Sequence, residues 1–225
     1  MNKRILLVAS VREKSMRCKN KMTRSFGNTT LFDIMAKKME RLKDLAIFDE
    51  VIVSMGREDS TLWKMKDNYS VKIQERDVYS ITNADTVAKV HPYFKDYSQS
   101  HIMWLNSSFP FITIDTICKC ANFFINNDIN SLHLVKKKAN WYWSKEMKPL
   151  NIRDKSLICT QDSEPIYESV HAFHIYNRKY AMDNNAYWDF SKDNPFLYVV
   201  DDSFEFLDID TENDFKLCEM VRGFI

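Results

Sequence analysis

Two groups of residues in this chain have the types and spacing needed to bind an anionic ligand together with a metal ion. Near the start, the apolar run Ile5–Ser10 leads into a segment rich in Arg and Lys, Arg12–Lys21. Near the end, Asp208 and Asp210 lie in a stretch, 201–219, that holds eight acids and one Lys. Cationic side chains bind phosphate oxygens, and Mg²⁺ prefers carboxylates together with substrate phosphates. The two segments therefore indicate a nucleoside triphosphate with its metal ion.

The position of the cationic segment favours a binding role over a solvated surface loop. Ile5–Ser10 reads as a parallel strand buried on both faces, and open α/β sheets bind ligands outside the carboxyl ends of such strands. Residues 1–25 carry a local charge of +7, whereas the whole chain carries +1. A focused basic site on a near-neutral body favours a small anionic ligand and excludes nucleic acid as the expected partner.

The spacing of Asp208 and Asp210 suits one cation. Residues i and i+2 of an extended segment face the same side, so both carboxylates can reach a single ion. A helix start is the alternative interpretation, with Thr211 as the cap and Asp214 three residues later. The two interpretations are compatible, because the cap needs Thr211 and not the two aspartates.

Three further motifs are weaker. Asn106 ends a strand and has the donor and acceptor that suit the edge of a base, but taken alone it is better explained by an Asx turn before the next helix. His171 and His174 are expected to face opposite sides of a strand, which does not favour a metal site. Cys118-x-Cys120 lies in a helical stretch and is expected to line the core.

Composition limits the class of protein. The 225 residues fit one domain, and 45% hydrophobic residues suffice for a sizeable core. Five scattered cysteines form no disulfide framework, no apolar run is long enough to span a membrane, and no signal peptide is evident, so a cytoplasmic protein is expected. The three glycines (Gly27, Gly56 and Gly223) exclude a Walker loop and a dinucleotide fingerprint.

Strands and helices alternate along the first 136 residues, which predicts an α/β fold with a doubly wound, mostly parallel sheet. After Lys136 an aromatic-rich part, about 137–195, predicts a small antiparallel extension. The predicted strands are Ile5–Ser10, Glu50–Ser54, Val71–Ile73, His101–Leu105, Ser131–Val135, Val170–Tyr176, Phe196–Val200 and Phe204–Leu207. The predicted helices are Thr30–Leu45, Thr113–Asn126 and Thr211–Arg222, the last ending at Gly223.

The order of three motifs resembles the acylneuraminate cytidylyltransferase family. Its first-strand motif, A-R-G-G-S-K-R-x-x-x-K-N, is matched in register by Arg12, Ser15, Arg17 and Lys21. Its Gln-Pro-Thr-Ser-Pro segment is matched loosely by 106–110, and its terminal D-I-D-T-E-x-D-F is matched closely by 208–215. Together the motifs cover essentially the whole chain, and their order and spacing are more specific than any one motif.

The departures from the family pattern mark a divergent member. Glu13 and Lys14 replace both loop glycines, and Met16 and Met22 replace the family's Lys and Asn. Asn106 stands where Gln is usual, Ile112 where Arg is frequent, and Thr160 where an Arg precedes the Gln-Asp pair of sialic-acid enzymes. Transfer of a cytidylyl group is therefore better supported than sialic acid as the acceptor.

The resemblance implies a nucleotide-diphospho-sugar transferase fold in a single domain, 1–225, with 137–195 on the acceptor side or at a dimer contact. It implies a homodimer that uses CTP and Mg²⁺ and releases pyrophosphate on forming a CMP-linked sugar acid. The implied catalytic residues are Arg12, Lys21 and Asp210; the nucleotide ligands are Arg12, Ser15, Arg17, Lys21, Arg76 and Asn106; the metal ligands are Asp208 and Asp210; and the acceptor ligands are Gln161, Tyr167 and Asn177.

Two alternatives remain open from the sequence. One is a nucleotidyltransferase that acts on a phosphonate or another non-sugar anion. The other is a catalytically weak homologue that binds a nucleotide, which the substitutions at Glu13, Lys14 and Met22 motivate and the presence of Arg12 and Lys21 opposes.

Overall fold

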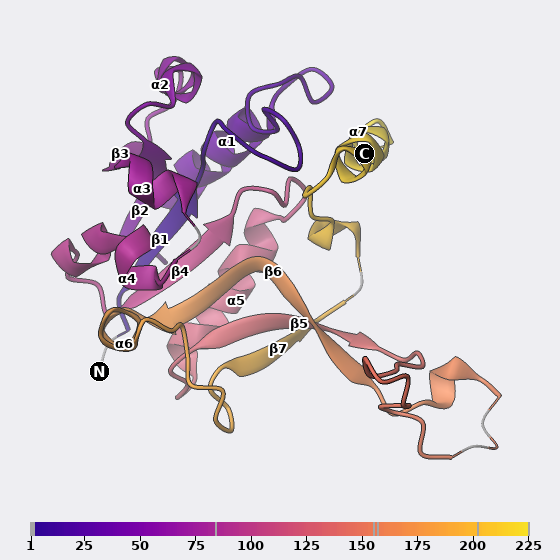
Figure 1. Cartoon of the computed structure of the whole chain (residues 1–225). Helices are drawn as coiled ribbons and strands as arrows, with labels where there is room; N and C mark the ends of the chain where they lie inside the picture. Colours follow the sequence, from indigo (N-terminus) through magenta and orange to yellow (C-terminus); the bar gives the residue numbers. More distant parts are fainter. Residues whose placement is uncertain (1–2, 84, 155, 157, 202, 225) are drawn as a thin grey trace.

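The computed structural model describes residues 3–83, 85–154, 156, 158–201 and 203–224. Within them, seven strands form one sheet in the order β3-β2-β1-β4-β6-β5-β7 (Figure 1). Six strands run in one direction, and only β6 is antiparallel to its neighbours. The strands are β1 (Ile5–Ser10), β2 (Glu50–Gly56), β3 (Lys72–Arg76), β4 (His101–Asn106), β5 (Leu132–Lys138), β6 (Ile166–Asn177) and β7 (Phe196–Val200). The predicted mostly parallel α/β sheet with an antiparallel part is confirmed.

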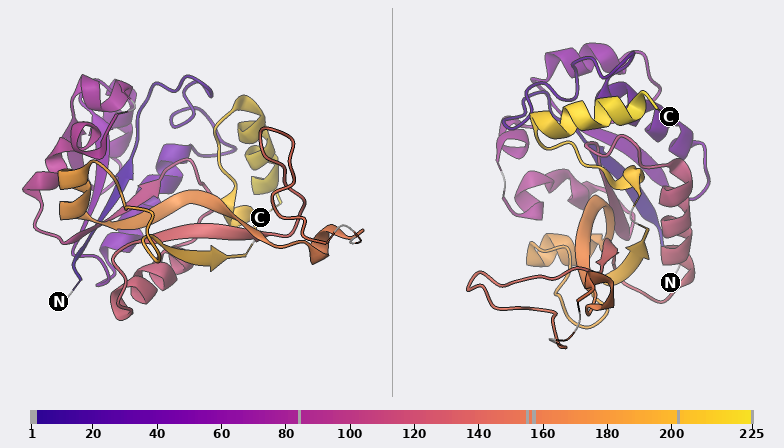
Figure 2. Two further views of the ribbon diagram at one scale, coloured as in Figure 1. Left: turned by 60° about the horizontal axis from the view of Figure 1, so that its bottom comes forward. Right: turned by 90° about the vertical axis from the view of Figure 1, so that its right-hand side faces the viewer.

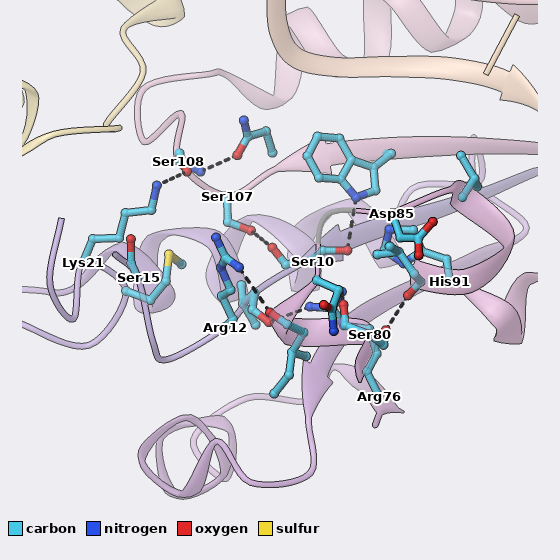
Figure 3. Close-up of a pocket in the computed structure, with 18 of the residues that line it drawn as sticks. Ser10, Arg12, Ser15, Lys21, Arg76, Ser80, Asp85, His91, Ser107 and Ser108 are labelled. Atoms are coloured by element: carbon cyan, nitrogen blue, oxygen red, sulfur yellow. Dashed lines mark hydrogen bonds between the residues drawn. The ribbon is translucent and has the colours of Figure 1, made fainter. Parts of the chain in front are cut away.

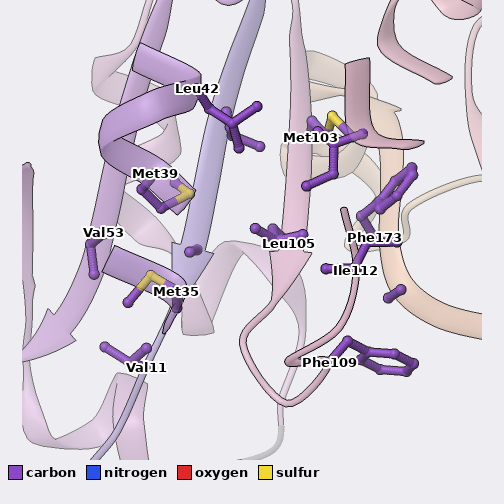
Figure 4. Close-up of a cluster of buried hydrophobic side chains, with 14 of the residues drawn as sticks. Val11, Met35, Met39, Leu42, Val53, Met103, Leu105, Phe109, Ile112 and Phe173 are labelled. Carbon is purple, nitrogen blue, oxygen red and sulfur yellow. The ribbon is translucent and has the colours of Figure 1, made fainter. Parts of the chain in front are cut away.

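Both faces of the sheet are covered, as the continuous apolar run of β1 predicts. On one face, α1 (Leu31–Lys43) and α5 (Ile114–Asn126) pack on alternate residues of the central strands. Figure 4 shows Met35, Met39 and Leu42 of α1 directed at the side chains of the sheet. On the other face a smaller cluster joins Leu6 and Val8 to α4 (Val87–Val90), η1 (Pro92–Asp96) and α6 (Arg178–Asn184). The layers on either side of the sheet are visible in Figure 2.

A threonine caps each of the three long helices at the predicted start. The Thr30 side chain accepts a hydrogen bond from the Asp33 backbone, and Thr113 accepts one from Thr116. Before α7 (Glu212–Arg222), Thr211 and Asp214 form a reciprocal capping box. These caps satisfy backbone N–H groups that have no partner within the helix.

Several details differ from the sequence-based predictions. Phe204–Leu207, predicted as a strand, forms the short 3₁₀ helix η3 (Phe204–Phe206). Gly223 ends α7 in a right-handed conformation (φ −67°) and not in the left-handed one usual for a terminal glycine. The short helices α2 (Ser60–Lys66), α3 (Val78–Thr82), α4 and α6 were not predicted, because they span too few turns to establish a helical period.

The pairing of β5 with β6 changes register within the sheet. His133 pairs with His174, but the next residue, Leu134, pairs with Val170. Ala172 and Phe173 consequently both enter the larger core cluster. The irregularity reverses the alternation, so His171 and His174 approach His133 together. The prediction that His171 and His174 face opposite sides is therefore wrong.

The segment 139–165 connects β5 to β6, and its described residues form an arm that projects from the sheet (Figures 1 and 2). The buried side chain of Asn151 accepts from the Tyr142 backbone and donates to the carbonyls of Asn140 and Glu164. Trp143, Met147 and other large apolar side chains of this arm are exposed. Among the described helices, none is both long and apolar enough to cross a membrane.

Candidate active site

A cavity of about 400 Å³ opens at the carboxyl ends of β1 and β4 (Figure 3). Its size is at the lower end of the range for small-molecule sites. Its walls come from the loop after β1, the segment from β3 to α4, the turn after β4 and the residues before α7. It is lined by seven of the residues singled out in the sequence: Arg12, Ser15, Arg17, Lys21, Arg76, Asn106 and Asp210. The fold thus brings one cationic loop and one carboxylate from opposite ends of the chain to a single cavity.

The loop after β1 is held in place by hydrogen bonds of Glu13, one of the two residues that replace the glycines of the similar motif. The Glu13 carboxylate accepts hydrogen bonds from the backbone N–H and the hydroxyl of Thr61, at 3.0 and 2.6 Å. The Glu13 backbone N–H donates to Oδ1 of Asp59 at 3.1 Å. Neither Glu13 nor Lys14 has a positive φ, so this backbone does not require glycine at either position. Glu13 therefore fastens the loop to the start of α2.

Lys21, the last residue of the cationic segment, is held in place by two hydrogen bonds. Its Nζ donates to Oγ of Ser108 and to the carbonyl oxygen of Ile209, both at 2.7 Å. The side chain is 15% exposed. Burial lowers the pKa of Lys21, although Asp210 and Asp208 act in the opposite direction. Lys21 therefore places a fixed donor between the turn after β4 and the acidic segment before α7.

Arg17 and Arg12 differ from Lys21 in being exposed. Nη2 of Arg17 lies 2.9 Å from Oδ1 of Asp210, whereas Lys21 Nζ lies 3.9 Å from the same oxygen. Nη1 of Arg12 donates to the Ile81 carbonyl at 3.2 Å, and both residues line the cavity. Exposed cations with weak partners can reorient toward a phosphate at small cost.

The residues before α7 fit a divalent cation. Oδ1 of Asp208 is buried and has no hydrogen-bond partner among the described residues. Burial, followed by repulsion from Asp210, raises the pKa of Asp208 to about 6. A cation between Asp208 and Asp210 would satisfy the unpaired oxygen and remove the repulsion. Asp214 is not available in the same way, because its carboxylate completes the capping box of α7.

Arg76 supports the wall of the cavity. This buried guanidinium donates to the carbonyls of Ser80 and Val11, at 3.3 and 3.2 Å, and burial lowers its pKa. Arg76 therefore ties the end of β1 to α3. His91 lies on the same wall, 5% exposed and stacked on Phe94 with ring centroids 4.9 Å apart. Burial lowers the pKa of His91 to about 3, so its imidazole is neutral near pH 7.

Asn106 meets both interpretations of its sequence position. Its Oδ1 accepts a hydrogen bond from the Ser108 backbone at 3.0 Å, which is an Asx turn. Its side chain also lines the cavity, and its Nδ2 has no hydrogen-bond partner among the described residues. The amide oxygen of Asn106 therefore stabilises the turn, and its Nδ2 donor remains available to a ligand.

Two aromatic residues of the cavity were missed in the sequence. Trp104 lies two residues before Asn106 on β4, so strand alternation places it on the same face and could have revealed it. Its Nε1 donates to Oγ of Ser10 at 3.1 Å. Tyr187 reaches the cavity from the segment after α6, and no motif or period indicated that position.

The residues predicted to bind the acceptor lie away from this cavity. Gln161 is exposed on the arm, in η2 (Thr160–Asp162), and Tyr167 is exposed on β6 opposite Lys137. The Asn177 side chain caps α6 by accepting from the Tyr180 backbone. None of the three lines the cavity, so their roles stay predictions.

Comparison with known proteins shows the fold. No family model matches the chain, and no curated protein matches it. Solved structures of cytidylyltransferases do match it over nearly its whole length. The 4-diphosphocytidyl-2C-methyl-D-erythritol synthase of Anaerococcus prevotii aligns with a TM-score of 0.66 at 12% identity, covering 99% of this chain and 100% of that one.

Two other structures align in the same way. The CMP:2-keto-3-deoxy-manno-octonic acid synthetase in complex with CTP has a TM-score of 0.70 at 10% identity, with 98% and 99% of the two chains covered. A cytidylyltransferase from Leptospira borgpetersenii has a TM-score of 0.61 at 16% identity, with 100% of this chain and 88% of that one covered. The protein therefore has the α/β fold of these nucleotidyltransferases.

Proposed function

We propose that this protein is a Mg²⁺-dependent cytidylyltransferase of the acylneuraminate type. It would transfer CMP from CTP to a small anionic acceptor, a sialic-acid-like or other 2-keto sugar acid, and release pyrophosphate. One observation carries the proposal: Arg12, Arg17 and Lys21 share a single cavity with Asp210, next to the unpaired carboxylate oxygen of Asp208. The proposal is consistent with the fold shared with structures whose names describe cytidylyl transfer.

The chain's own residues account for binding of the nucleotide. Arg12, Ser15 and Arg17 would hold the triphosphate from the loop after β1, and Lys21 would bind a phosphate oxygen from a fixed position. The free Nδ2 donor of Asn106 would bind an acceptor atom of cytosine, such as its ring nitrogen or carbonyl oxygen. Arg76 would act indirectly, by holding the wall of the cavity in place.

Catalysis would consist of positioning and charge stabilisation. The hydroxyl oxygen of the acceptor would attack the α-phosphorus and lose its proton to solvent. The bond from the α-phosphorus to the oxygen of the β-phosphate would break, and pyrophosphate would leave with its charge balanced by the cationic loop. Asp208 and Asp210 would hold Mg²⁺, which as a Lewis acid withdraws charge from the phosphate oxygens. Both carboxylates must be ionised to bind the cation. Asp210 must also give up its contact with Arg17, which frees its Oδ1 for the cation.

The acceptor is proposed on the resemblance alone. Gln161, Tyr167 and Asn177 remain candidate acceptor ligands, and the arm 139–165 with its exposed apolar side chains remains a candidate contact of a homodimer. The neighbouring structures are named for different acceptors, so the fold does not select one. We do not favour the alternative of a catalytically weak homologue. Glu13 anchors the loop after β1 to Thr61 although both glycines of the motif are absent.

Thermal unfolding with Mg²⁺ and each of CTP, UTP, ATP and GTP tests the nucleotide. A ligand present at a hundredfold excess over its Kd stabilises the folded state by about 2.7 kcal/mol, which raises the Tm of a chain of this size by roughly 6–10 °C. We expect a shift with CTP that disappears on chelation of the metal. Equal shifts with all four nucleotides would contradict the role of Asn106, and no shift would contradict nucleotide binding.

Turnover tests the metal assignment. Release of pyrophosphate from CTP should depend on a 2-keto sugar acid, and Asp210→Asn should lower it by on the order of 100-fold or more because a ligand of the cation is lost. Asp214→Asn, which changes a nearby capping carboxylate, is the matched control and should retain most of the rate. Unchanged turnover in Asp210→Asn would overturn the metal site.

A further inference from the structure

The irregular pairing of β5 and β6 gathers three histidines that the proposed function does not use. His133 lies on β5, whereas His171 and His174 lie on β6 on either side of Ala172 and Phe173, which turn toward the opposite core. The ring nitrogens that these histidines offer all lie within 4.8 Å of one another. Three imidazoles at this separation meet the first requirement of a transition-metal site.

The distances are those of a site that needs only small side-chain rotations to close. Bonds of 2.0–2.1 Å to a tetrahedral ion place ligand nitrogens about 3.4 Å apart. The ring centroids of His133 and His171 are 5.2 Å apart, and those of His133 and His174 are 6.1 Å apart. The hydroxyl of Ser169 is hydrogen-bonded to Nε2 of His133 and lies 3.3 Å from Nε2 of His171. Both Nε2 atoms are therefore directed toward one point.

The two inner histidines have polar atoms that nothing satisfies. His174 is 3% exposed, and neither of its ring nitrogens has a hydrogen-bond partner among the described residues. His133 is 5% exposed, and its Nδ1 is likewise unpaired. An unsatisfied buried polar group is costly, and native structures usually explain each one by a partner or an ion. An ion held by this cluster would pair with one nitrogen of His174, whereas His133 would bind it through Nε2 and keep its Nδ1 unpaired.

Aromatic neighbours restrict the rings to small movements. Trp188 packs against His133 and His174 with centroid separations of 5.1 and 5.5 Å. Trp104 stacks on His174 at 5.3 Å, with 28° between the ring planes. A site whose ligands are already restrained loses little side-chain entropy on binding an ion. The exposed His171 leaves the cluster open to solvent on one side.

We propose that His133, His171 and His174 form a site for a borderline divalent transition metal such as Zn²⁺, with a fourth position open to water. Imidazole nitrogens select such ions, whereas Mg²⁺ prefers the carboxylates of Asp208 and Asp210. The site is distinct from the proposed Mg²⁺ site and lies behind Trp104, whose ring lines the nucleotide cavity.

Calorimetric titration of the full chain with Zn²⁺, after treatment with a chelator, tests the site without any nucleotide. We expect one ion per chain, with an affinity that falls on the order of 100-fold in His171→Ala because a ligand is lost. His171 is exposed, so this variant should keep the Tm of the metal-free wild type. Co²⁺ bound to the wild type should show the intense visible absorption of a four-coordinate ion, and His133→Gln should abolish it.

Two controls separate this site from other metal-binding groups. The Asp208→Asn, Asp210→Asn double variant should bind Zn²⁺ as tightly as the wild type, although it loses Mg²⁺. Cys159→Ser removes an exposed thiol and should also bind Zn²⁺ unchanged. Equal Zn²⁺ affinity in wild type and His171→Ala, or no binding in the wild type below about 0.1 mM, would overturn the proposal. Because CTP is absent, failure here leaves the proposed cytidylyltransferase activity untouched.

Discussion

Arg17 donates a hydrogen bond of 2.9 Å to Oδ1 of Asp210, across 193 positions of sequence. The pair joins the loop after β1 to the residues before α7 at the edge of the cavity. Both side chains are substantially exposed, at 69% and 39%, and exposed ion pairs contribute about 0–1 kcal/mol. The contact is therefore weak enough for a metal ion to take Asp210 and for a phosphate to take Arg17.

Arg17→Gln should separate the binding of phosphate by Arg17 from the binding of the metal ion by Asp210. The affinity for CTP with Mg²⁺ should fall about tenfold or more, because a charged contact contributes about 1.5–3 kcal/mol. The affinity for Mg²⁺ alone should stay equal or rise, since Asp210 loses its competitor. Titration calorimetry with each ligand measures both effects. A parallel loss of both affinities would contradict the exchange of partners.

Lys21→Met tests the buried cation. The side chain keeps its length, but Ser108 Oγ and the Ile209 carbonyl lose their donor at 2.7 Å. We expect stability to fall by about 1–2 kcal/mol and the affinity for CTP to fall by roughly 10–100-fold. Lys19→Met, which changes an exposed lysine of the same loop, is the matched control for urea unfolding and calorimetry. An unchanged CTP affinity in Lys21→Met would remove Lys21 from the site.

Glu13→Ala tests whether the anchor on Thr61 prepares the loop for binding. Both hydrogen bonds lie at the surface, so stability should change by less than about 1 kcal/mol. The affinity for CTP should fall by about three- to tenfold, because the ligand must then order residues 12–21. Hydrogen exchange of the loop amides should rise in Glu13→Ala and much less in Glu13→Gln, which retains an acceptor. Equal exchange in wild type and Glu13→Ala would contradict the anchoring role.

Gly56→Ala tests the close packing beneath the loop. A Cβ at Gly56 would lie 2.6 Å from Cδ1 of Ile81 and 2.7 Å from Oδ2 of Asp59. Asp59 receives hydrogen bonds from both Gly56 and Glu13, so its displacement would loosen the loop. We expect a loss of about 1–3 kcal/mol in urea unfolding, as is usual for overpacking. The control Gly223→Ala lies at the end of α7 and should lose much less; equal losses would contradict the packing argument.

The sequence predicted the main elements because their signals are long or local. The buried run Ile5–Ser10 and the periodic helices Thr30–Leu45 and Thr113–Asn126 agree with the structure within a few residues. Phe204–Leu207 was misassigned because four residues with alternating apolar side chains fit a strand and a 3₁₀ turn equally well. The shift of register at His133 could not be foreseen, since strand irregularities depend on packing between strands.

For the site, the residues involved could be predicted from the sequence, but their contacts with one another could not. Strand-end position was enough to bring Arg12, Lys21 and Asn106 to one cavity. The contact of Arg17 with Asp210 joins the two ends of the chain, and such contacts depend on the whole topology. Tyr187 reaches the cavity only because α6 and the segment after it fold back over β6, which no local pattern encodes.

His91→Phe tests the neutral imidazole in the cavity wall. Burial, and then the positive charge of Arg76, lowers the pKa of His91 to about 3. The unfolded chain binds this proton near pH 6.5, so between pH 6.5 and 3 the unfolded state holds more protons than the folded state. The free energy of unfolding therefore falls as the pH drops below about 6.5, by about 2 kcal/mol at pH 5 from this residue. Phenylalanine cannot be protonated and retains a ring that stacks on Phe94.

Urea unfolding at pH 7 and pH 5 measures this difference. The wild type should lose about 2 kcal/mol more than His91→Phe between the two pH values. Contributions from the buried His101 and His133 are common to both proteins and cancel in the comparison. Burial dominates the lowered pKa of His174, and the charge of His91 contributes least to it. The substitution itself shifts stability equally at both pH values, because the Tyr93 hydroxyl loses its contact with Nδ1 at 3.1 Å regardless of pH. The same loss in both proteins would mean that His91 is protonated in the folded state at pH 5, and that the wall of the cavity is open to water.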